Sequence, residues 1–174
     1  NLMQAVVDRF KHEGDSGKLR AVRKAKEGSV RGIRYVDDKT EANFSPVPGK
    51  MGVLSYPIYF NNAGLYVFWA RAFSTGPEDN GLHVGINGSW PESSSRVQLC
   101  PGKHQWTWSS AQRRDHNHCG DPKTVLLSVP SPGLHTIQLS MREDGFEFDK
   151  FLMTTDREFN PAAGPGPETR VKSG

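Results

Sequence analysis

The sequence lacks long apolar runs, and this absence excludes one class of protein. None of the apolar stretches in the 174 residues approaches the roughly 18 residues that a membrane-spanning helix needs. Hydrophobic residues make up only 35% of the chain, which fits thin sheets joined by long polar loops. We therefore predict no membrane partner.

Motifs for nucleotide or nucleophile chemistry are also missing. There is no Gly-x-Ser-x-Gly motif and no phosphate-cradling glycine loop. The net charge of +3 is a mild excess, much of it in residues 18–34. A basic patch can bind nucleic acid or acidic glycans, but no recognition-helix or zinc-finger pattern accompanies this one. We predict a solvated arm and no nucleic-acid partner.

Cysteine is scarce, with only Cys100 and Cys119 in the chain. An isolated pair that flanks a polar loop indicates a disulfide if the protein is exported. Two alternatives stay open. The thiols can be buried and unpaired, or they can join His116 and His118 around a metal, although His-x-His-Cys is not a familiar zinc spacing.

Turn residues, in contrast, are abundant. The 18 glycines and 12 prolines are too many for a helical bundle and suit many short strands. Strand-like runs recur about every 8–12 residues with turns between them, and no βαβ alternation is present. The runs are 53–60, 65–73, 81–86, 96–100, 104–108, 124–129, 134–141 and 146–154. We predict an all-β fold, an antiparallel β-sandwich of jelly-roll type.

The length favours one domain with a poorly defined N-terminal segment. Residues 2–10 fit either a first strand or a short helical turn, and residues 18–26 carry helix formers with a weak apolar stripe. We predict an N-terminal arm or first strand over 1–34 and a sandwich over 35–159. The Pro/Gly-rich residues 160–174 are predicted to be a linker or tail.

Candidate sugar-binding groups lie in or beside the loops. A sugar ring needs a flat aromatic surface for its C–H face and planar polar groups for its hydroxyls. The predicted carbohydrate-binding set is Trp90, Trp106, Trp108, Arg71, Asn80, His83, Arg142, Glu143 and Asp144. Each also fits a structural role; Trp90 before Pro91 fits a packing plug, and Trp69 in mid-strand fits the core.

Acidic residues cluster between 143 and 149. Two carboxylates can cleave a glycosidic bond when they lie about 5 Å or about 6.5–9.5 Å apart on opposite sides of it. Glu143 and Asp144 are neighbours on one turn, so we predict no catalysis, and a small hydrolase or lyase is the least favoured hypothesis. Asp149 lies in an apolar strand and needs a partner, which calcium, a lysine or an arginine can supply.

Four phrases of the sequence together resemble a known type of bacterial module. They are 66–76 (YVFWARAFSTG), 79–93 (DNGLHVGINGSWPES), 106–110 (WTWSS) followed by Gln112-Arg113 and His118-Cys119-Gly120, and 141–150 (MREDGFEFDK). They are similar to β-sandwich carbohydrate-binding modules related to families 6 and 35. The likeness is greatest to the C-terminal module of glycoside hydrolase family 115 and of other secreted polysaccharide-degrading proteins, and it covers about 48–159.

The resemblance implies a jelly roll that binds sugar in the loops at one end and performs no catalysis. It implies a bacterial parent chain with a catalytic domain, secreted, periplasmic or on the cell surface. It also implies a structural calcium between an early-strand acid and a last-strand aspartate. Asp149 matches the last-strand position; the usual Glu-Ala-Glu phrase is absent, and Asp8 is the nearest match to the early acid.

The function predicted from these observations is that of a non-catalytic carbohydrate-binding module. Its ligand is a polysaccharide or oligosaccharide, and it targets an attached enzyme to plant or algal polysaccharide. The alternative is a structural or interaction sandwich that braces a neighbouring catalytic domain. The family resemblance does not specify the sugar.

Overall fold

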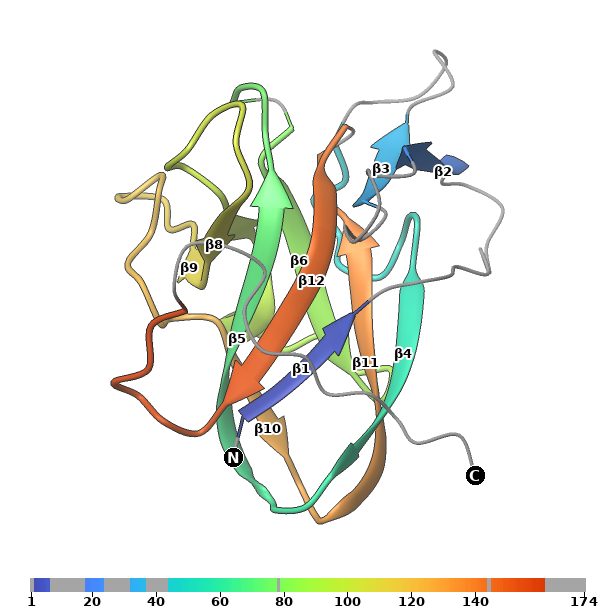
Figure 1. Ribbon diagram of the computed structural model, residues 1–174, viewed down its shortest axis with the longest axis vertical. Coiled ribbons are helices and arrows are strands. Elements are labelled where there is room, and N and C mark those ends of the chain that lie inside the picture. Colours follow the sequence, from blue (N-terminus) through green and yellow to red (C-terminus); the bar gives the residue numbers. More distant parts are fainter. Residues whose placement is uncertain are drawn as a thin grey trace.

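Two antiparallel sheets packed face to face form the fold, as seen in a computed structural model (Figure 1). The structure describes residues 2–6, 18–23, 32–36, 44–77, 79–143 and 145–161, with side chains described from Phe44 onward. The first sheet has the order β10-β5-β12-β3-β2, and β1 and β8 pair with β12 and β5. Its strands are β1 (Leu2–Val6), β2 (Lys18–Arg23), β3 (Gly32–Val36), β5 (Gly64–Phe73), β8 (Thr107–Ser109), β10 (Leu126–Val129) and β12 (Glu147–Thr154).

The second sheet has the order β4-β11-β6-β7-β9. Its strands are β4 (Leu54–Phe60), β6 (Gly81–Ile86), β7 (Val97–Gln98), β9 (Ala111–Gln112) and β11 (Gly133–Met141). A 3-10 turn, η1 (Glu92–Ser94), follows β6. The predicted all-β antiparallel sandwich is confirmed. Within the described residues, the structure contains no helix with the length and apolar character needed to cross a bilayer.

The helix formers of residues 18–26 do not give a helix over 18–23. The structure places β2 there, paired with β3 from Lys18↔Val36 to Arg23↔Gly32. Helix propensity is a weak preference that tertiary pairing overrides, and here the neighbouring strand supplies the backbone hydrogen bonds. Residues 2–6 follow the strand alternative and pair with β12.

The core lies between the sheets and follows the period-two pattern of the strands. Tyr66, Phe68 and Ala70 of β5 point inward, and they are at most 1% exposed. From the facing sheet, Ile137 and Leu139 of β11 enter the same cluster. This packed interior fixes the ends of β5, β6 and β11, from which the loops at one end of the sandwich emerge.

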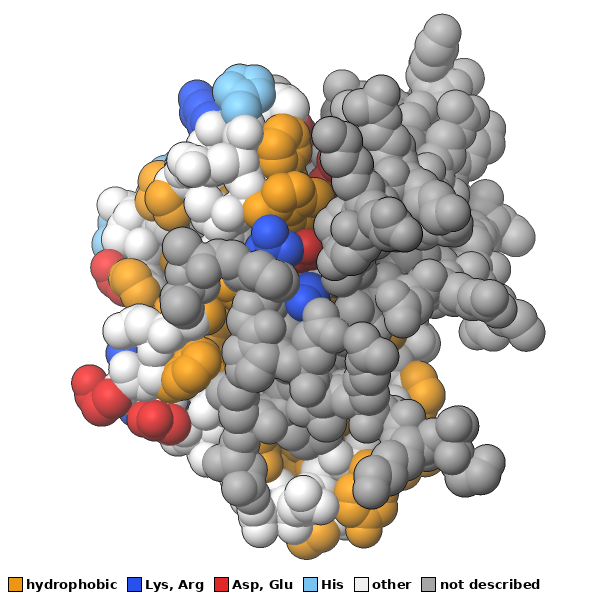
Figure 2. Space-filling model, viewed as in Figure 1, with side chains coloured by type: hydrophobic (Ala, Val, Ile, Leu, Met, Phe, Trp, Pro, Cys, Tyr) orange, Lys and Arg blue, Asp and Glu red, His pale blue; other side chains and the backbone are white. Residues whose placement is uncertain are grey.

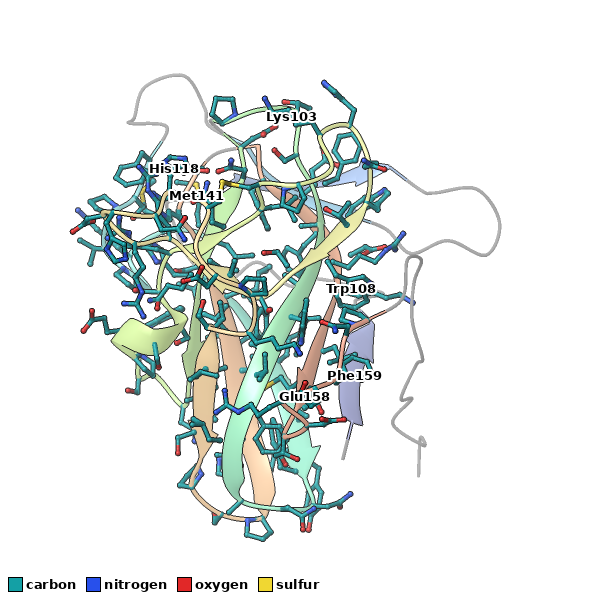
Figure 3. The ribbon with its side chains drawn as sticks, turned by 90° about the vertical axis from the view of Figure 1, so that its left-hand side faces the viewer. Lys103, Trp108, His118, Met141, Glu158 and Phe159 are labelled. Atoms are coloured by element: carbon teal, nitrogen blue, oxygen red, sulfur yellow. A yellow bond between two sulfur atoms is a disulfide. The ribbon has the colours of Figure 1, made fainter. Side chains whose placement is uncertain are left out.

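A smaller apolar cluster covers the outer face of the first sheet. Val67, Trp69 and Leu152 form its buried part, and the half-buried Trp108 and Phe159 pack on it (Figure 3). The predicted packing role of Trp69 is confirmed, since it is 6% exposed. Trp108 belongs to this cluster, so at least part of its ring is used in packing.

Cys100 and Cys119 form a disulfide, the first of the three alternatives open from the sequence (Figure 3). The bond closes a loop with a sequence separation of 19. It links the polar loop that carries His118 to Cys100, which lies just after β7.

Replacing both cysteines with serine is expected to lower the free energy of unfolding by about 3 kcal/mol, because the open loop gains entropy in the unfolded chain. Urea unfolding with and without a reductant measures the effect. The urea midpoint of the double variant should not change with reductant and should equal that of the reduced wild type. An unchanged wild-type midpoint under reduction would contradict the prediction.

Candidate functional site

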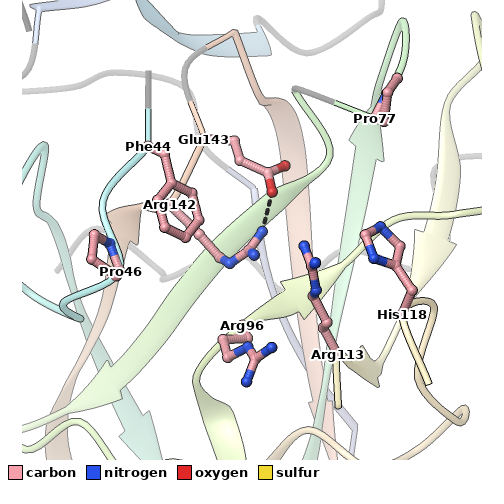
Figure 4. Close-up of a pocket in the computed structure, with 8 residues that line it drawn as sticks. All are labelled: Phe44, Pro46, Pro77, Arg96, Arg113, His118, Arg142 and Glu143. Atoms are coloured by element: carbon pink, nitrogen blue, oxygen red, sulfur yellow. Dashed lines mark hydrogen bonds and ion pairs between the residues drawn. The ribbon is translucent and has the colours of Figure 1, made fainter. Parts of the chain in front are cut away.

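A cleft with a volume of about 550 Å³ opens among the loops at one end of the sandwich (Figure 4). These loops follow β5, β9 and β11 and precede β4 and β7. The residues that line the cleft are Phe44, Pro46, Pro77, Arg96, Arg113, His118, Arg142 and Glu143.

The lining is rich in positive charge. Three arginines face a single carboxylate, that of Glu143. Both oxygens of this carboxylate are engaged: Oε1 pairs with Arg142, and Oε2 accepts a hydrogen bond from the Asn80 N–H at 2.8 Å. Glu143 therefore neutralises Arg142 and leaves the charges of Arg96 and Arg113 to be balanced by other groups.

Arg96 and Arg113 differ in their partners. The Arg96 guanidinium donates two 3.0 Å hydrogen bonds to Asp115, whose side chain is 91% exposed. The Arg113 side chain has no hydrogen bond or ion pair among the residues that the structure describes. Its neighbour Arg114 instead lies 3.8 Å from Glu92, outside the cleft lining. Arg113 is thus the cation most available to an incoming anion.

A buried polar network holds Arg142 in place. Arg142 is 2% exposed, and its guanidinium contacts Glu143 and the Gln98 side-chain oxygen. Gln98 in turn donates to the side-chain oxygen of Asn80. Burial lowers the pKa of Arg142, and the nearby Glu143 carboxylate opposes this change. A Cβ at Gly81 would lie 2.6 Å from the guanidinium, so the close approach of Arg142 requires glycine there.

The segment before β4 forms the wall next to Arg142. The Phe44 ring lies 4.8 Å from the centre of the Arg142 guanidinium, a cation–π distance. The Ser45 N–H donates to the Arg142 carbonyl at 2.7 Å. Phe44 and Pro46 are therefore held against the end of β11 by both main-chain and ring contacts.

His83 lies beneath the cleft and is fully buried. Its Nε2 is 2.9 Å from the Ser45 carbonyl, and its Nδ1 accepts the Arg96 N–H at 3.1 Å. The ring is therefore neutral with its proton on Nε2. Burial lowers the pKa of His83 to about 4, with further lowering from Arg142 and Arg96. Its position rules out direct contact with a ligand in the cleft.

Asp79 shapes the loop that carries Pro77. Its carboxylate accepts hydrogen bonds from the Thr75 N–H at 3.0 Å, the Gly76 N–H at 2.9 Å and the Ser74 hydroxyl at 2.8 Å. Burial alone would raise the pKa of Asp79, but these hydrogen bonds outweigh it and the pKa is lowered. The charged carboxylate thus holds this wall of the cleft.

Comparison with known families decides the identity of the fold. Residues 28–168 match the glycosyl hydrolase family 115 C-terminal domain. The chain belongs to this family. A relative from Formosa agariphila, "Uncharacterized protein P23", is 53% identical over 132 residues, which cover 76% of this chain and 32% of that protein. The chain thus spans about one third of the length of this relative.

Solved structures share the fold of this family 115 C-terminal domain at low sequence identity. A family 35 carbohydrate-binding module from Clostridium thermocellum superposes with a TM-score of 0.51 at 11% identity, covering 89% of this chain and 92% of that one. A module of Cellvibrio mixtus lichenase 5A, solved with cellotriose, gives 0.52 at 14% identity and covers 90% and 98%. The Podospora anserina GH26-CBM35 mannanase gives 0.54 at 11% and covers 92% and 29%.

The family 115 C-terminal domain gathers four of the predicted sugar-binding residues at the cleft. Arg142 and Glu143 line it, while Asn80 and His83 support it from below. Asp144, another residue of the predicted set, lies outside the described residues. Two of the lining residues, Arg142 and Glu143, are nearly buried, so they present few atoms to a ligand.

The remaining predicted residues lie elsewhere. Trp90 covers the outer side of β6: a Cβ at Gly85 would lie 2.8 Å from its ring, and one at Gly49 only 2.4 Å. This is the packing-plug alternative. Arg71 lies on the first sheet, 5.4 Å from the Trp106 ring, and Trp106 also packs on Phe73.

Asp149 occupies a bulge of β12, where the pairing with β5 shifts between Phe148 and Lys150. Its Oδ2 pairs with Arg71, which is the arginine partner that the sequence left open. Burial raises the pKa of Asp149 to about 6, against the opposing effect of Arg71 and Lys150. Its buried Oδ1 has no hydrogen-bond partner in the described part of the chain. That oxygen fits a cation ligand; Asp8, the other predicted ligand, is outside the described residues, so calcium stays a prediction.

Sequence reasoning missed six of the eight lining residues as sugar contacts: the apolar Phe44, Pro46 and Pro77, and the polar Arg96, Arg113 and His118. They lie in loops, where no periodic pattern indicates which way a side chain points. One signal was present: the loops 96–118 carry three arginines, and Arg113 and His118 stand in the phrases that resemble the family.

Proposed function

We propose that this domain is a non-catalytic module that binds an acidic polysaccharide in the loop-end cleft. Through this binding it targets an attached enzyme to plant or algal polysaccharide outside the cell. The observation that carries the proposal is the cleft lining, with three arginines and one carboxylate that is already engaged. Arginine's planar fork suits the bidentate binding of carboxylate and sulfate groups.

The charge balance favours an acidic over a neutral glycan. With Arg142 paired to Glu143 and Arg96 paired to an exposed aspartate, Arg113 remains unpaired in the described residues. A uronate carboxylate or a sulfate ester bound at Arg113 would relieve the repulsion among the three cations. A neutral sugar would leave that repulsion in place.

Retention in native gels tests this proposal directly. We expect gels cast with alginate, pectin or carrageenan to slow the purified protein, and gels cast with agarose or xylan to slow it little. Repeating the series with calcium and then with a chelator tests the predicted metal, whose removal should weaken the fold or the binding. Equal mobility in every gel, with the protein folded, would refute polysaccharide binding.

Arg113→Ala is expected to abolish retention on the acidic gels and to leave the melting temperature within about 2 °C. A half-exposed side chain that bonds to none of the described residues contributes little stability. Arg114→Ala is the matched control, because it removes the same charge from the adjacent position outside the cleft. If the two variants lose retention equally, attraction to the overall positive charge explains the binding and the cleft does not.

A second candidate function is a bracing role beside a neighbouring domain. Tyr59 and Leu134, a cross-strand pair on β4 and β11, are 62% and 69% exposed. Tyr59 is near the end of β4 and Leu134 near the start of β11, so both lie at the end of the sandwich away from the cleft. Figure 2 shows hydrophobic side chains at the lower end of the molecule. Tyr59→Ser with Leu134→Ser would weaken a domain contact and leave gel retention unchanged, which distinguishes the two candidates.

A further inference from the structure

In the described part of the chain, the His83 side chain bonds to both walls of the cleft. Its Nε2–H donates to Ser45, which stands between the lining residues Phe44 and Pro46. Its Nδ1 accepts the N–H of Arg96, on the opposite wall. The Arg96 carbonyl then accepts the Arg113 N–H at 2.9 Å. One imidazole therefore connects the aromatic wall to both outer arginines.

The backbone at Arg96 needs this support. Its φ of 55° is a left-handed conformation that a residue with a side chain rarely adopts. Such a conformation persists only where surrounding contacts hold it. Here the contacts are the hydrogen bond to His83 on one side of the residue and the one from Arg113 on the other.

We propose that His83 is the positioning residue of the cleft: its neutral ring, protonated on Nε2, sets the spacing between the Phe44–Pro46 wall and the Arg96–Arg113 wall. The inference rests on the proposed function only in so far as the cleft is the binding site. His83 is buried and touches no ligand, so it acts through the main chain of the residues that do.

A second proton on the ring would break this arrangement. Protonated Nδ1 cannot accept the Arg96 N–H, and the charges that face the ring, Arg96 and Arg142, are both positive. Ser140, opposite His83 on β11, is uncharged, and so are the described residues 44–48 beside the ring. The lowered pKa of about 4 means that the fold keeps the ring neutral. An unfolded chain takes up the proton below about pH 6.5, so this contribution to stability is present above pH 6.5 and is lost as the pH falls towards 4.

Two substitutions remove the two hydrogen bonds of the His83 ring one at a time. The amide of asparagine reaches the position of Nδ1, so His83→Asn keeps an acceptor for Arg96 and loses the donor to Ser45. The amide of glutamine reaches the position of Nε2, so His83→Gln keeps the donor and loses the acceptor. His135→Asn is the control, because His135 is also buried with both nitrogens bonded, to Ser131 and Asn87, at the other end of β11.

The probe is inorganic sulfate, which stays doubly charged between pH 7 and pH 4, and the readout is the NMR signal of the Arg113 Nε–H. We expect each His83 variant to bind sulfate about tenfold more weakly than the wild type, the effect of losing one hydrogen bond. His135→Asn should bind like the wild type even if it melts earlier. Unchanged affinity in both His83 variants, or an equal loss in His135→Asn, would overturn the proposal.

The backbone amide signals of Arg96 and Arg113 test the positioning role of His83 without a ligand. The Arg96 and Arg113 amide signals should move in His83→Gln, stay in His83→Asn, and titrate in the wild type with the His83 ring near pH 4. Amides that do not follow the ring would overturn the positioning role. If the wild type binds no sulfate while the amides behave as expected, the anion-binding function fails and the role of His83 stands.

Discussion

Glu143→Gln is expected to lower the free energy of unfolding by about 3–5 kcal/mol, although the change replaces one oxygen with an isosteric amide. The reason is the charge left behind. Arg142 is 2% exposed, and Glu143 is its carboxylate partner. Removing one partner of a buried ion pair leaves the other charge uncompensated, at a cost of about that size.

The pair can be tested as a cycle of variants. Arg142→Met alone should also destabilise, because it leaves the Glu143 carboxylate buried without its cation. The double variant Arg142→Met/Glu143→Gln should recover part of the loss, since no charge then remains to be buried. Urea unfolding of the four proteins measures the coupling. Losses that simply add would show that the two side chains do not depend on each other.

The same variant bears on the acidic turn as a catalytic group. Glu143 has both oxygens engaged, one by Arg142 and one by the Asn80 N–H. A hydrolase would lose release of reducing sugar in Glu143→Gln at a temperature where the variant is folded. A binding module would release none before or after the change.

Trp90→Ala is expected to cost about 2–4 kcal/mol of stability, somewhat below the range for a fully buried tryptophan because the ring is half-buried. The ring fills the space above two glycines, Gly49 and Gly85. Gly49 also donates its N–H to the Ser140 hydroxyl at 2.8 Å. Loss of the ring would therefore free the segment that leads from Phe44 and Pro46 into β4.

Gly85→Ala provides an independent check. Its added methyl would lie 2.8 Å from the Trp90 ring and 2.7 Å from the Ser89 carbonyl, so it should displace the same side chain. Both variants should melt earlier and lose gel retention together. Trp106→Ala removes a half-exposed ring on the first sheet and should lower the free energy of unfolding by less than Trp90→Ala does. A Trp90→Ala variant that melts like the wild type but loses retention would instead make Trp90 a sugar platform.

The long strands were predictable because each carries its own alternation. In β11 the inward residues Ile137, Leu139 and Met141 are spaced two apart, and the turn after Asn87 is marked by the Asn-Gly pair. The strands that escaped were β2 and β3, whose residues carry helix formers or no clear alternation, and β9 at the loop end, which has two residues and no pattern to read. The pairing of β9 depends on a partner that is distant in sequence.

The site was predictable only in part, for a related reason. His83 stands between Leu82 and Val84, so the alternation of β6 puts it on the opposite face, and its place in the predicted sugar-binding set required that face to be open. Both faces of β6 are in fact buried, because the Ser45 segment and Trp90 cover the outer one. No local sequence pattern indicates that another segment will cover a strand face. His83, which supports the cleft, was therefore predicted to line it.

The cleft draws its lining from widely separated parts of the chain, Phe44 before the first core strand and Glu143 after β11 among them. Contacts of this kind form late and slowly, since each requires a long loop of chain to close first. A partly folded molecule can therefore have much of its sandwich and still have no cleft. Ligand retention during refolding would count only the molecules that have completed the whole topology, and it would lag behind the return of the β-sheet signal.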